Sequence, residues 1–153
     1  MHYPFIVVRY GQGARAPARV FDGEKERFQR ILSDKQDQTN ATPGWLRAVR
    51  AAEAKKATDI KVLDLGGITS FTDHFVICTG ANQRQIQTIC DEVTLRLKQA
   101  GEMPLSVEGY TQAEWVLADY GDFLVHVFSP AAREYYALER LWRAAKTVEI
   151  PAA

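Results

Sequence analysis

The sequence predicts an α/β domain in which helices pack on a mixed β-sheet. Three observations predict this fold class. Residues 86–97 repeat apolar side chains at helical spacing, residues 75–78 form a short apolar run, and residues 114–128 have the pattern of a β-hairpin. The chain of 153 residues is long enough for one domain whose core needs neither disulfides nor metals. Because helical and strand-like segments alternate, we expect them to pack in layers.

Composition narrows the classes of protein that the chain can belong to. The hydrophobic share of 46% is ordinary for a globular domain, and no apolar run approaches the ~20 residues that cross a bilayer. The two cysteines, Cys78 and Cys90, lack CxxC spacing and are expected in the core. Residues 46–153 hold twelve bases and fourteen acids, a balance that disfavours broad contact with nucleic acid and permits docking on a basic protein.

The first part of the chain has a different character from the rest. Residues 1–43 are expected to form an N-terminal extension, poorly ordered or loosely packed, with a strand at 3–10, a helix at 24–32 and a linker at 36–41. Residues 1–21 hold three arginines and no acid, so a mitochondrial or plastid transit peptide is an alternative to a cytoplasmic protein with a tail. We place the main domain at 44–148 and a C-terminal tail at 149–153.

From Thr42 onward each element has its own signal. Thr42 supplies a cap and Pro43 a first helical position for a helix that reaches about residue 57. Residues 59–65 alternate as a strand that Gly66-Gly67 ends, and residues 71–79 form a second strand. The next helix begins where Asn82 and Gln85 resemble a capping box. Its apolar stripe consists of Ile86, Ile89, Cys90, Val93 and Leu97, and Ala100-Gly101 ends it.

The second half of the domain centres on the hairpin. Residues 104–108 can supply a short strand, and the runs 115–118 and 123–128 are apolar on both faces, which indicates a covered sheet. Between them, Asp119-Tyr120-Gly121-Asp122 is a turn that we expect to stay in water and to display Trp115 beside it as a docking edge. Ser129-Pro130 opens a last helix with a stripe of Tyr135, Leu138, Leu141 or Trp142, and Ala145.

Sequence motifs for metal binding, phosphate binding or small-ligand binding are weak throughout the chain. The three histidines, His2, His74 and His126, are far apart and form no metal-ligand pair, so we expect no metal, and His126 is expected to be packed and bonded to a neighbour. Gly66-Gly67 is followed by a strand instead of a helix, which disfavours a phosphate loop. The helix start at residues 79–84 is the most credible small-ligand position, although an ordinary cap accounts for Asn82. We expect no cofactor.

Several separated blocks resemble the ribosomal silencing factor family, also called the Iojap family. Residues 70–80 read SFTDHFVICTG, residues 115–128 read WVLADYGDFLVHVF, and residues 133–142 carry the pattern R-x-x-Y-x-L-E-x-L-W. The resemblance covers roughly residues 44–148. It implies a fold related to the nucleotidyltransferases without their catalytic acids. Enzymes of that fold carry D-h-[DE] after the glycine pair, whereas residues 77–81 contain no acid and Phe75 stands where a second acid would follow Asp73. Two-metal phosphoryl transfer needs both acids. The resemblance therefore implies a protein that is not an enzyme.

The family resemblance also implies a partner. Its members bind the large ribosomal subunit through the fourteenth large-subunit protein and block joining of the small subunit when nutrients are short. Free members can pair as homodimers, which this sequence neither supports nor excludes. Carried over by position, the resemblance predicts a set of docking residues with Trp115 as the anchor and the two arginines as weaker candidates. The set consists of Trp115, Leu117, Asp119, Tyr120, Gly121, Asp122, Arg84 and Arg133.

Two alternatives stay open from the sequence. One is a nucleotide-binding or nucleotidyltransferase-type enzyme that keeps a pocket near Gly66-Gly67, Thr79 and Asn82. The other is a ribosome assembly factor that uses the same surface, which would differ from a silencing factor in the stage at which it binds the subunit.

Overall fold

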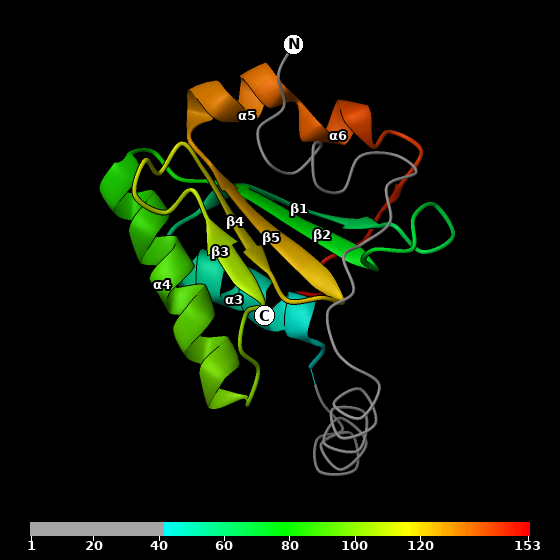
Figure 1. Ribbon diagram of the computed structural model, residues 1–153, viewed down its shortest axis with the longest axis horizontal. Coiled ribbons are helices and arrows are strands. Elements are labelled where there is room, and N and C mark those ends of the chain that lie inside the picture. The colour runs from blue at the N-terminus through cyan, green and yellow to red at the C-terminus, as the bar shows by residue number, and fades with distance from the viewer. Residues whose placement is uncertain (1–41) are drawn as a thin grey trace.

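A single mixed β-sheet organises the computed structural model, which describes residues 42–153 (Figure 1). The expected elements in residues 1–41 lie outside the described residues. The sheet has six strands in the order β3-β4-β5-β2-β1-β6. Neighbouring strands run antiparallel except β2 and β5, which are parallel. The elements in chain order are α3 (Gly44–Ala54), β1 (Thr58–Asp64), β2 (His74–Thr79), α4 (Gln83–Gln99), β3 (Ser106–Glu108), β4 (Trp115–Asp119), β5 (Phe123–Phe128), α5 (Pro130–Tyr136), α6 (Leu138–Leu141) and β6 (Lys146–Thr147). The predicted fold class, a mixed sheet flanked by helices, is confirmed.

The two faces of the sheet carry separate cores. Alternate residues of β1, β2, β4 and β5 point to opposite faces, so each strand contributes to both. One face packs on α3 and α4 through a cluster that includes Val62, Val76 and Val125, together with the predicted stripe of α4. The other face packs on α5 and α6 through a cluster that includes Phe75, Leu124 and Trp142. Figure 1 shows the two helix pairs on opposite sides of the sheet.

Helix α4 begins as the sequence predicts. The Asn82 side chain accepts a hydrogen bond from the backbone N–H of Gln85 at 2.8 Å. The Gln85 side chain reaches back to accept one from the backbone N–H of Ala81 at 2.6 Å and donates to the carbonyls of Lys55 and Lys56. These bonds satisfy backbone groups that a helix terminus leaves open, so the start of α4 is fixed against the end of α3. The helix start at residues 79–84, which the sequence suggested as a small-ligand position, is an ordinary helix cap.

Three details differ from the predicted elements. Pro43 occupies the N-cap position of α3 and makes no side-chain cap bond, so the expected cap by Thr42 is wrong. The last helix is interrupted at Ala137, whose φ of 43° is left-handed and divides it into α5 and α6. The interruption breaks the expected stripe, so Tyr135 does not share the sheet-facing side with Leu138, and its side chain is 60% exposed instead of lying in the core. Strand β6 was not predicted, because two residues carry no periodic signal.

Candidate functional site

Asp119, the first acid of the hairpin turn, closes this turn through a hydrogen bond. Strands β4 and β5 pair from Trp115 opposite Phe128 to Asp119 opposite Leu124, as predicted. Gly121 has a φ of 88°, which only glycine adopts readily, and its N–H donates to Oδ1 of Asp119 at 2.8 Å. The Asp119 side chain is thereby held inside the turn and the residue is 2% exposed. The expectation that Asp119 faces water is wrong.

Trp115 lies at the opposite end of the hairpin from the turn. It is the first residue of β4, four residues before Asp119, which places it about 13 Å away along the strand. Its indole N–H donates to Nδ1 of His126 at 3.1 Å, and its ring lies 4.8 Å from those of Phe128 and Tyr136. Trp115 is 3% exposed, so the expectation that it is displayed beside the turn is wrong. Leu117, in the middle of β4, is buried as well.

Several strands present their ends beside the turn, and we call this end of the sheet the tip end. The backbone N–H groups of Asp73 and His74 both donate to the carbonyl of Asp122, because β2 starts where β5 starts. On the other side of the turn, the N–H of Leu105 donates to the carbonyl of Asp119 at 2.6 Å. The turn residues are therefore fixed between the start of β2 and the segment that enters β3.

Apolar side chains gather around this turn. The rings of Trp45 and His74 stack at 5.5 Å, and both residues are half-buried. Tyr120 is half-buried and stacks on Phe123 at 5.0 Å. Leu105, which bonds to the turn, is 51% exposed, and Met103, two residues earlier in the chain, is 61% exposed. We define the tip surface as Trp45, His74, Met103, Leu105, Tyr120, Gly121 and Asp122.

Close backbone packing explains how α3 reaches the tip end. A Cβ atom added at Gly44 would lie 2.5 Å from the Phe123 ring and 2.8 Å from the Glu102 carboxylate. A glycine at this position lets the first turn of α3 approach the start of β5, and that approach places Trp45 beside His74.

Acidic side chains border the tip surface. Asp73 and Asp122 are exposed, and Glu102 is half-buried beside Tyr120 and Gly44. Burial raises the pKa of Tyr120 to about 12, with a further contribution from Glu102, so its hydroxyl stays protonated at neutral pH. The surface thus combines apolar side chains with carboxylates at its rim, an arrangement that suits contact with a basic protein.

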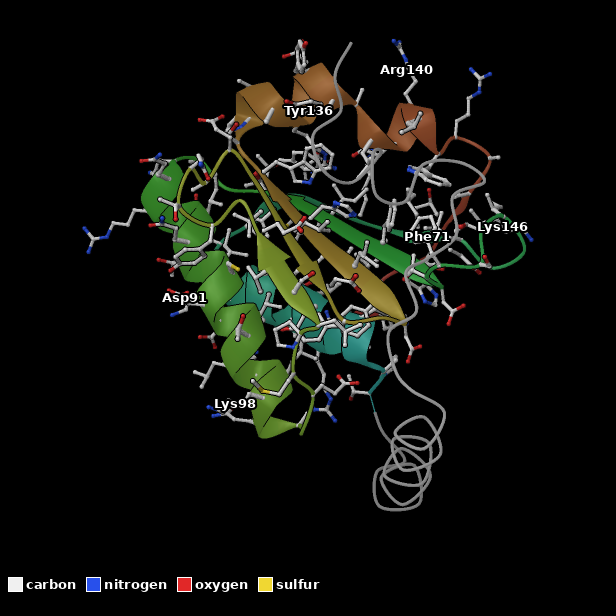
Figure 2. The ribbon with its side chains drawn as sticks, viewed as in Figure 1. Phe71, Asp91, Lys98, Tyr136, Arg140 and Lys146 are labelled. Atoms are coloured by element: carbon white, nitrogen blue, oxygen red, sulfur yellow. The ribbon has the colours of Figure 1, made fainter. Side chains whose placement is uncertain are left out.

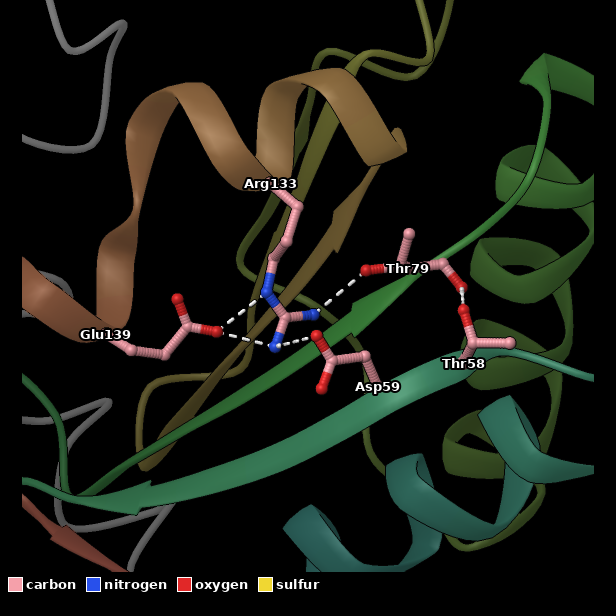
Figure 3. A network of polar contacts seen from close by, with 5 residues as sticks. All are labelled: Thr58, Asp59, Thr79, Arg133 and Glu139. Atoms are coloured by element: carbon pink, nitrogen blue, oxygen red, sulfur yellow. Dashed lines mark hydrogen bonds and ion pairs between the residues drawn. The ribbon is translucent and has the colours of Figure 1, made fainter.

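Arg133 lies in a network of polar contacts at the other end of the sheet, which we call the far end (Figure 3). Its Nη1 donates to the hydroxyl of Thr79 at 3.0 Å, and its Nε donates to Glu139 at 2.6 Å. Nη2 lies 2.5 Å from the same carboxylate and 3.5 Å from that of Asp59. The guanidinium therefore joins α5, α6, β1 and β2. Its side chain is only 9% exposed, which removes it from an open docking surface.

Apart from Leu117 and Asp119, which are buried in β4, the predicted docking residues fall into two groups. Tyr120, Gly121 and Asp122 lie together at the tip end. Arg84 is exposed, but it lies in the first turn of α4, which follows the far end of β2. Trp115 and Arg133 are buried toward the same far end. Sequence reasoning missed Trp45, His74, Met103 and Leu105 as neighbours of the turn. The parallel pairing of β2 with β5 and the position of α3 bring Trp45 and His74 there, and the pairing of β3 with β4 brings the segment of Met103 and Leu105.

The pieces of the alternative nucleotide pocket are far apart. Strand β1 ends just before Gly66-Gly67, whereas Thr79 is the last residue of its antiparallel partner β2, at the opposite end of the sheet, and Asn82 follows it. The six residues of β2 make five steps, which separate these ends by roughly 17 Å. An open hollow of about 430 Å³ at the far end is lined by Thr58, Asp59, Thr79, Pro130, Arg133 and Glu134. Within residues 42–153, no group of three His, Cys, Asp or Glu side chains is placed to hold a metal ion.

Comparisons with known proteins identify the class to which this α/β domain belongs. Residues 38–153 match the family described as "Ribosomal silencing factor during starvation". The chain belongs to this family, and membership gives it a ribosome-associated silencing role. Within residues 42–153, no helix has both the length and the hydropathy that crossing a membrane requires.

Individual relatives agree with the family assignment. The ribosomal silencing factor RsfS of Halalkalibacterium halodurans is 44% identical over 103 residues, which are 67% of this chain and 88% of the relative. The mouse protein "Mitochondrial assembly of ribosomal large subunit protein 1" is 30% identical over 58% of this chain and 40% of its own length. A crystal structure of a protein from Bacillus halodurans aligns with a TM-score of 0.61 at 43% identity, covering 67% of this chain and 93% of that one.

Proposed function

We propose that the protein binds the large ribosomal subunit through the tip surface and keeps the small subunit from joining it. Family membership supports a ribosomal partner. The observation that carries the proposal is the gathering of exposed and half-buried apolar side chains with carboxylates at one end of the sheet. The contact on the subunit is its fourteenth protein, on the face that meets the small subunit. The protein then acts by occupying space, chiefly when nutrients are short.

The exposure of the side chains supports docking through the tip surface instead of through Trp115, the anchor that the sequence suggested. A contact residue must lose exposed surface on binding in order to contribute to affinity, and Trp115 has little left to lose. Leu105 and Met103 have about half or more of their surface available. Tyr120 and Trp45 add aromatic area, which is frequent among the strongest contacts of interfaces. Asp122 and Asp73 at the rim favour encounter with a basic protein.

The name of the mouse relative favours a second candidate function. That protein is named for assembly of the large ribosomal subunit. An assembly factor would use the same tip surface and would bind incomplete large subunits. Sedimentation of a lysate that contains the tagged protein separates the two roles, because silencing predicts comigration with mature free large subunits and assembly predicts comigration with immature particles.

Leu105→Glu is expected to weaken binding to purified large subunits by roughly tenfold or more, because it places a charge in the apolar centre of the interface. Binding is measured by pelleting through a sucrose cushion. Tyr135→Glu is the matched control, since Tyr135 is a similarly exposed aromatic residue of α5 outside the tip surface, and its substitution should change binding little. Equal pelleting of Leu105→Glu and the wild type would contradict docking by the tip surface. Failure of the wild type to pellet would contradict the large subunit as partner.

A further inference from the structure

A second loop lies beside the hairpin turn at the tip end of the sheet. It comprises residues 65–73, and we call it the β1–β2 loop. Figure 1 shows it projecting beyond the sheet at the end where β5 begins. The backbone N–H of Leu65 donates to the carbonyl of Asp73 at 2.8 Å, and the N–H of Asp73 donates to the carbonyl of Asp122 at 2.9 Å. These two hydrogen bonds attach the loop directly to the last residue of the turn.

The conformation of the β1–β2 loop is fixed from both of its ends. Leu65 and Phe71 are buried in the core on the side of the sheet that α5 and α6 cover (Figure 2). Between them, the N–H groups of Ile68 and Thr69 donate to the carbonyl of Leu65 at 3.0 and 3.2 Å. Gly67 has a φ of 80°, which glycine adopts readily and other residues rarely do. The second glycine of the pair therefore shapes a tight turn of this loop.

Ile68 is the large apolar side chain that the β1–β2 loop presents to solvent. It is 42% exposed and belongs to neither core cluster. Its β-branched side chain has few rotamers to lose, and hydrogen bonds already fix the loop around it, so its burial by a partner costs little conformational entropy. Leu105 bonds to the turn on the side of β3, whereas the β1–β2 loop bonds to it on the side of β2. Ile68 and Leu105 therefore lie on opposite sides of the turn.

The charges around the β1–β2 loop favour a protein partner over nucleic acid. Residues 65–72 contain no charged side chain, and they lie between the carboxylates of Asp64 and Asp73. Lys146 pairs with Asp64 across β6 and β1, so one base accompanies these two acids. Contact with phosphate draws its affinity from clustered bases, which this loop lacks. An uncharged, exposed apolar side chain suits an apolar pocket of a protein instead.

We propose that the β1–β2 loop is a second contact of the docking site, and that Ile68 enters an apolar pocket of the protein partner on the large subunit. The inference rests on the proposed function, because it takes the tip surface as the first contact. It extends that surface across the starts of β5 and β2 to the end of β1. Two apolar contacts on opposite sides of the turn fix the orientation of the protein on its partner, which a single contact does not.

Ile68→Ser tests the loop contact, because it removes apolar area without changing the charge. We expect this variant to bind purified large subunits roughly fivefold or more weakly than the wild type, with an unchanged dependence on salt. Tyr135→Ser, which truncates an exposed side chain of α5, is the matched control and should bind as the wild type does. The melting temperature of Ile68→Ser should stay within about 3 °C of the wild type, since Ile68 lies outside both cores. Wild-type affinity of Ile68→Ser would overturn the proposal.

Cross-linking from the same position identifies the class of partner. Ile68→Cys and its control Tyr135→Cys are labelled with a benzophenone maleimide, bound to large subunits and irradiated. The natural cysteines react little, because burial raises the pKa of Cys78 to about 12 and that of Cys90 to about 11. We expect the label at position 68 to cross-link to a ribosomal protein and the label at position 135 to give a much lower yield. Cross-links to ribosomal RNA alone, or equal yields from the two positions, would contradict the loop contact.

The loop contact and the proposed function fail in different ways. If Leu105→Glu lost binding and Ile68→Ser kept it, docking through the tip surface would stand and the loop contact would fail. If Ile68→Ser lost binding and Leu105→Glu kept it, the loop would stand as a contact and docking through the tip surface would fail. If the wild type did not bind large subunits, both would fail together.

Discussion

Arg133→Ala is expected to lower the free energy of unfolding by about 3–5 kcal/mol, because it removes the cation from a buried network. Glu139 would lose both of its contacts with the guanidinium, and Thr79 would lose a donor. Asp59 should contribute little, since its side chain is 58% exposed and is screened by water. Urea unfolding followed by circular dichroism at neutral pH measures the change.

Two further variants separate structure from docking at this position. Arg140→Ala, on the outer side of α6, should change the free energy of unfolding by no more than about 0.5 kcal/mol. Arg133→Lys keeps the charge but cannot donate in the same planar fork, so it should recover only part of the loss. Unchanged stability of Arg133→Ala together with weaker binding to large subunits would instead make Arg133 a docking residue.

Acidification is expected to destabilise the fold through His126. Burial, together with the positive charge of Arg133, lowers the pKa of His126 to about 3, from an unfolded value near 6.5. Below pH 6.5 the unfolded chain therefore binds a proton that the folded protein excludes. The stability contributed by the neutral ring is full above that pH and falls by about 1.4 kcal/mol for each unit down toward the folded pKa. Over the whole window the loss is on the order of 4–5 kcal/mol.

His126→Asn isolates this contribution. The ring accepts the Trp115 N–H at Nδ1, and the asparagine amide oxygen can replace that acceptor without a titrating group. The variant should be less stable at pH 7.5, because a smaller side chain leaves a cavity beside Phe75. Its free energy of unfolding should nevertheless fall less steeply than that of the wild type between pH 6.5 and 4.5, when both are measured by urea titration. Parallel pH profiles would show that His126 titrates normally in the folded protein.

Sequence reasoning recovered the elements because their signals are local. The stripe of α4, its Asn82 cap and the two strands of the hairpin follow from the spacing of apolar residues and from turn chemistry, which the fold did not override. The bonded, packed state of His126 was also expected and is confirmed. The fold did override a local signal at Ala137. The helical pattern of apolar residues continues through this position in the sequence, but the left-handed conformation of Ala137 ends α5 there.

The site was harder to predict because it depends on long-range pairing. An aromatic residue near a turn in the sequence can point to either end of its strand and to either face of the sheet. Trp115 lies at the end of β4 that is away from the turn, where Tyr136 of α5 packs on its ring. Trp45, from a helix some seventy residues earlier, reaches the turn instead because Gly44 fits against Phe123. No periodicity in the sequence encodes these contacts.

A subunit-joining assay tests the central claim most directly. Purified large and small subunits are mixed in Mg²⁺ buffer, and formation of joined ribosomes is followed by light scattering. Large subunits incubated first with the wild-type protein should join poorly, and those incubated with Leu105→Glu should join as well as untreated subunits. Full joining by large subunits that are saturated with the wild-type protein would contradict the account, because a protein bound at the joining face must exclude the small subunit.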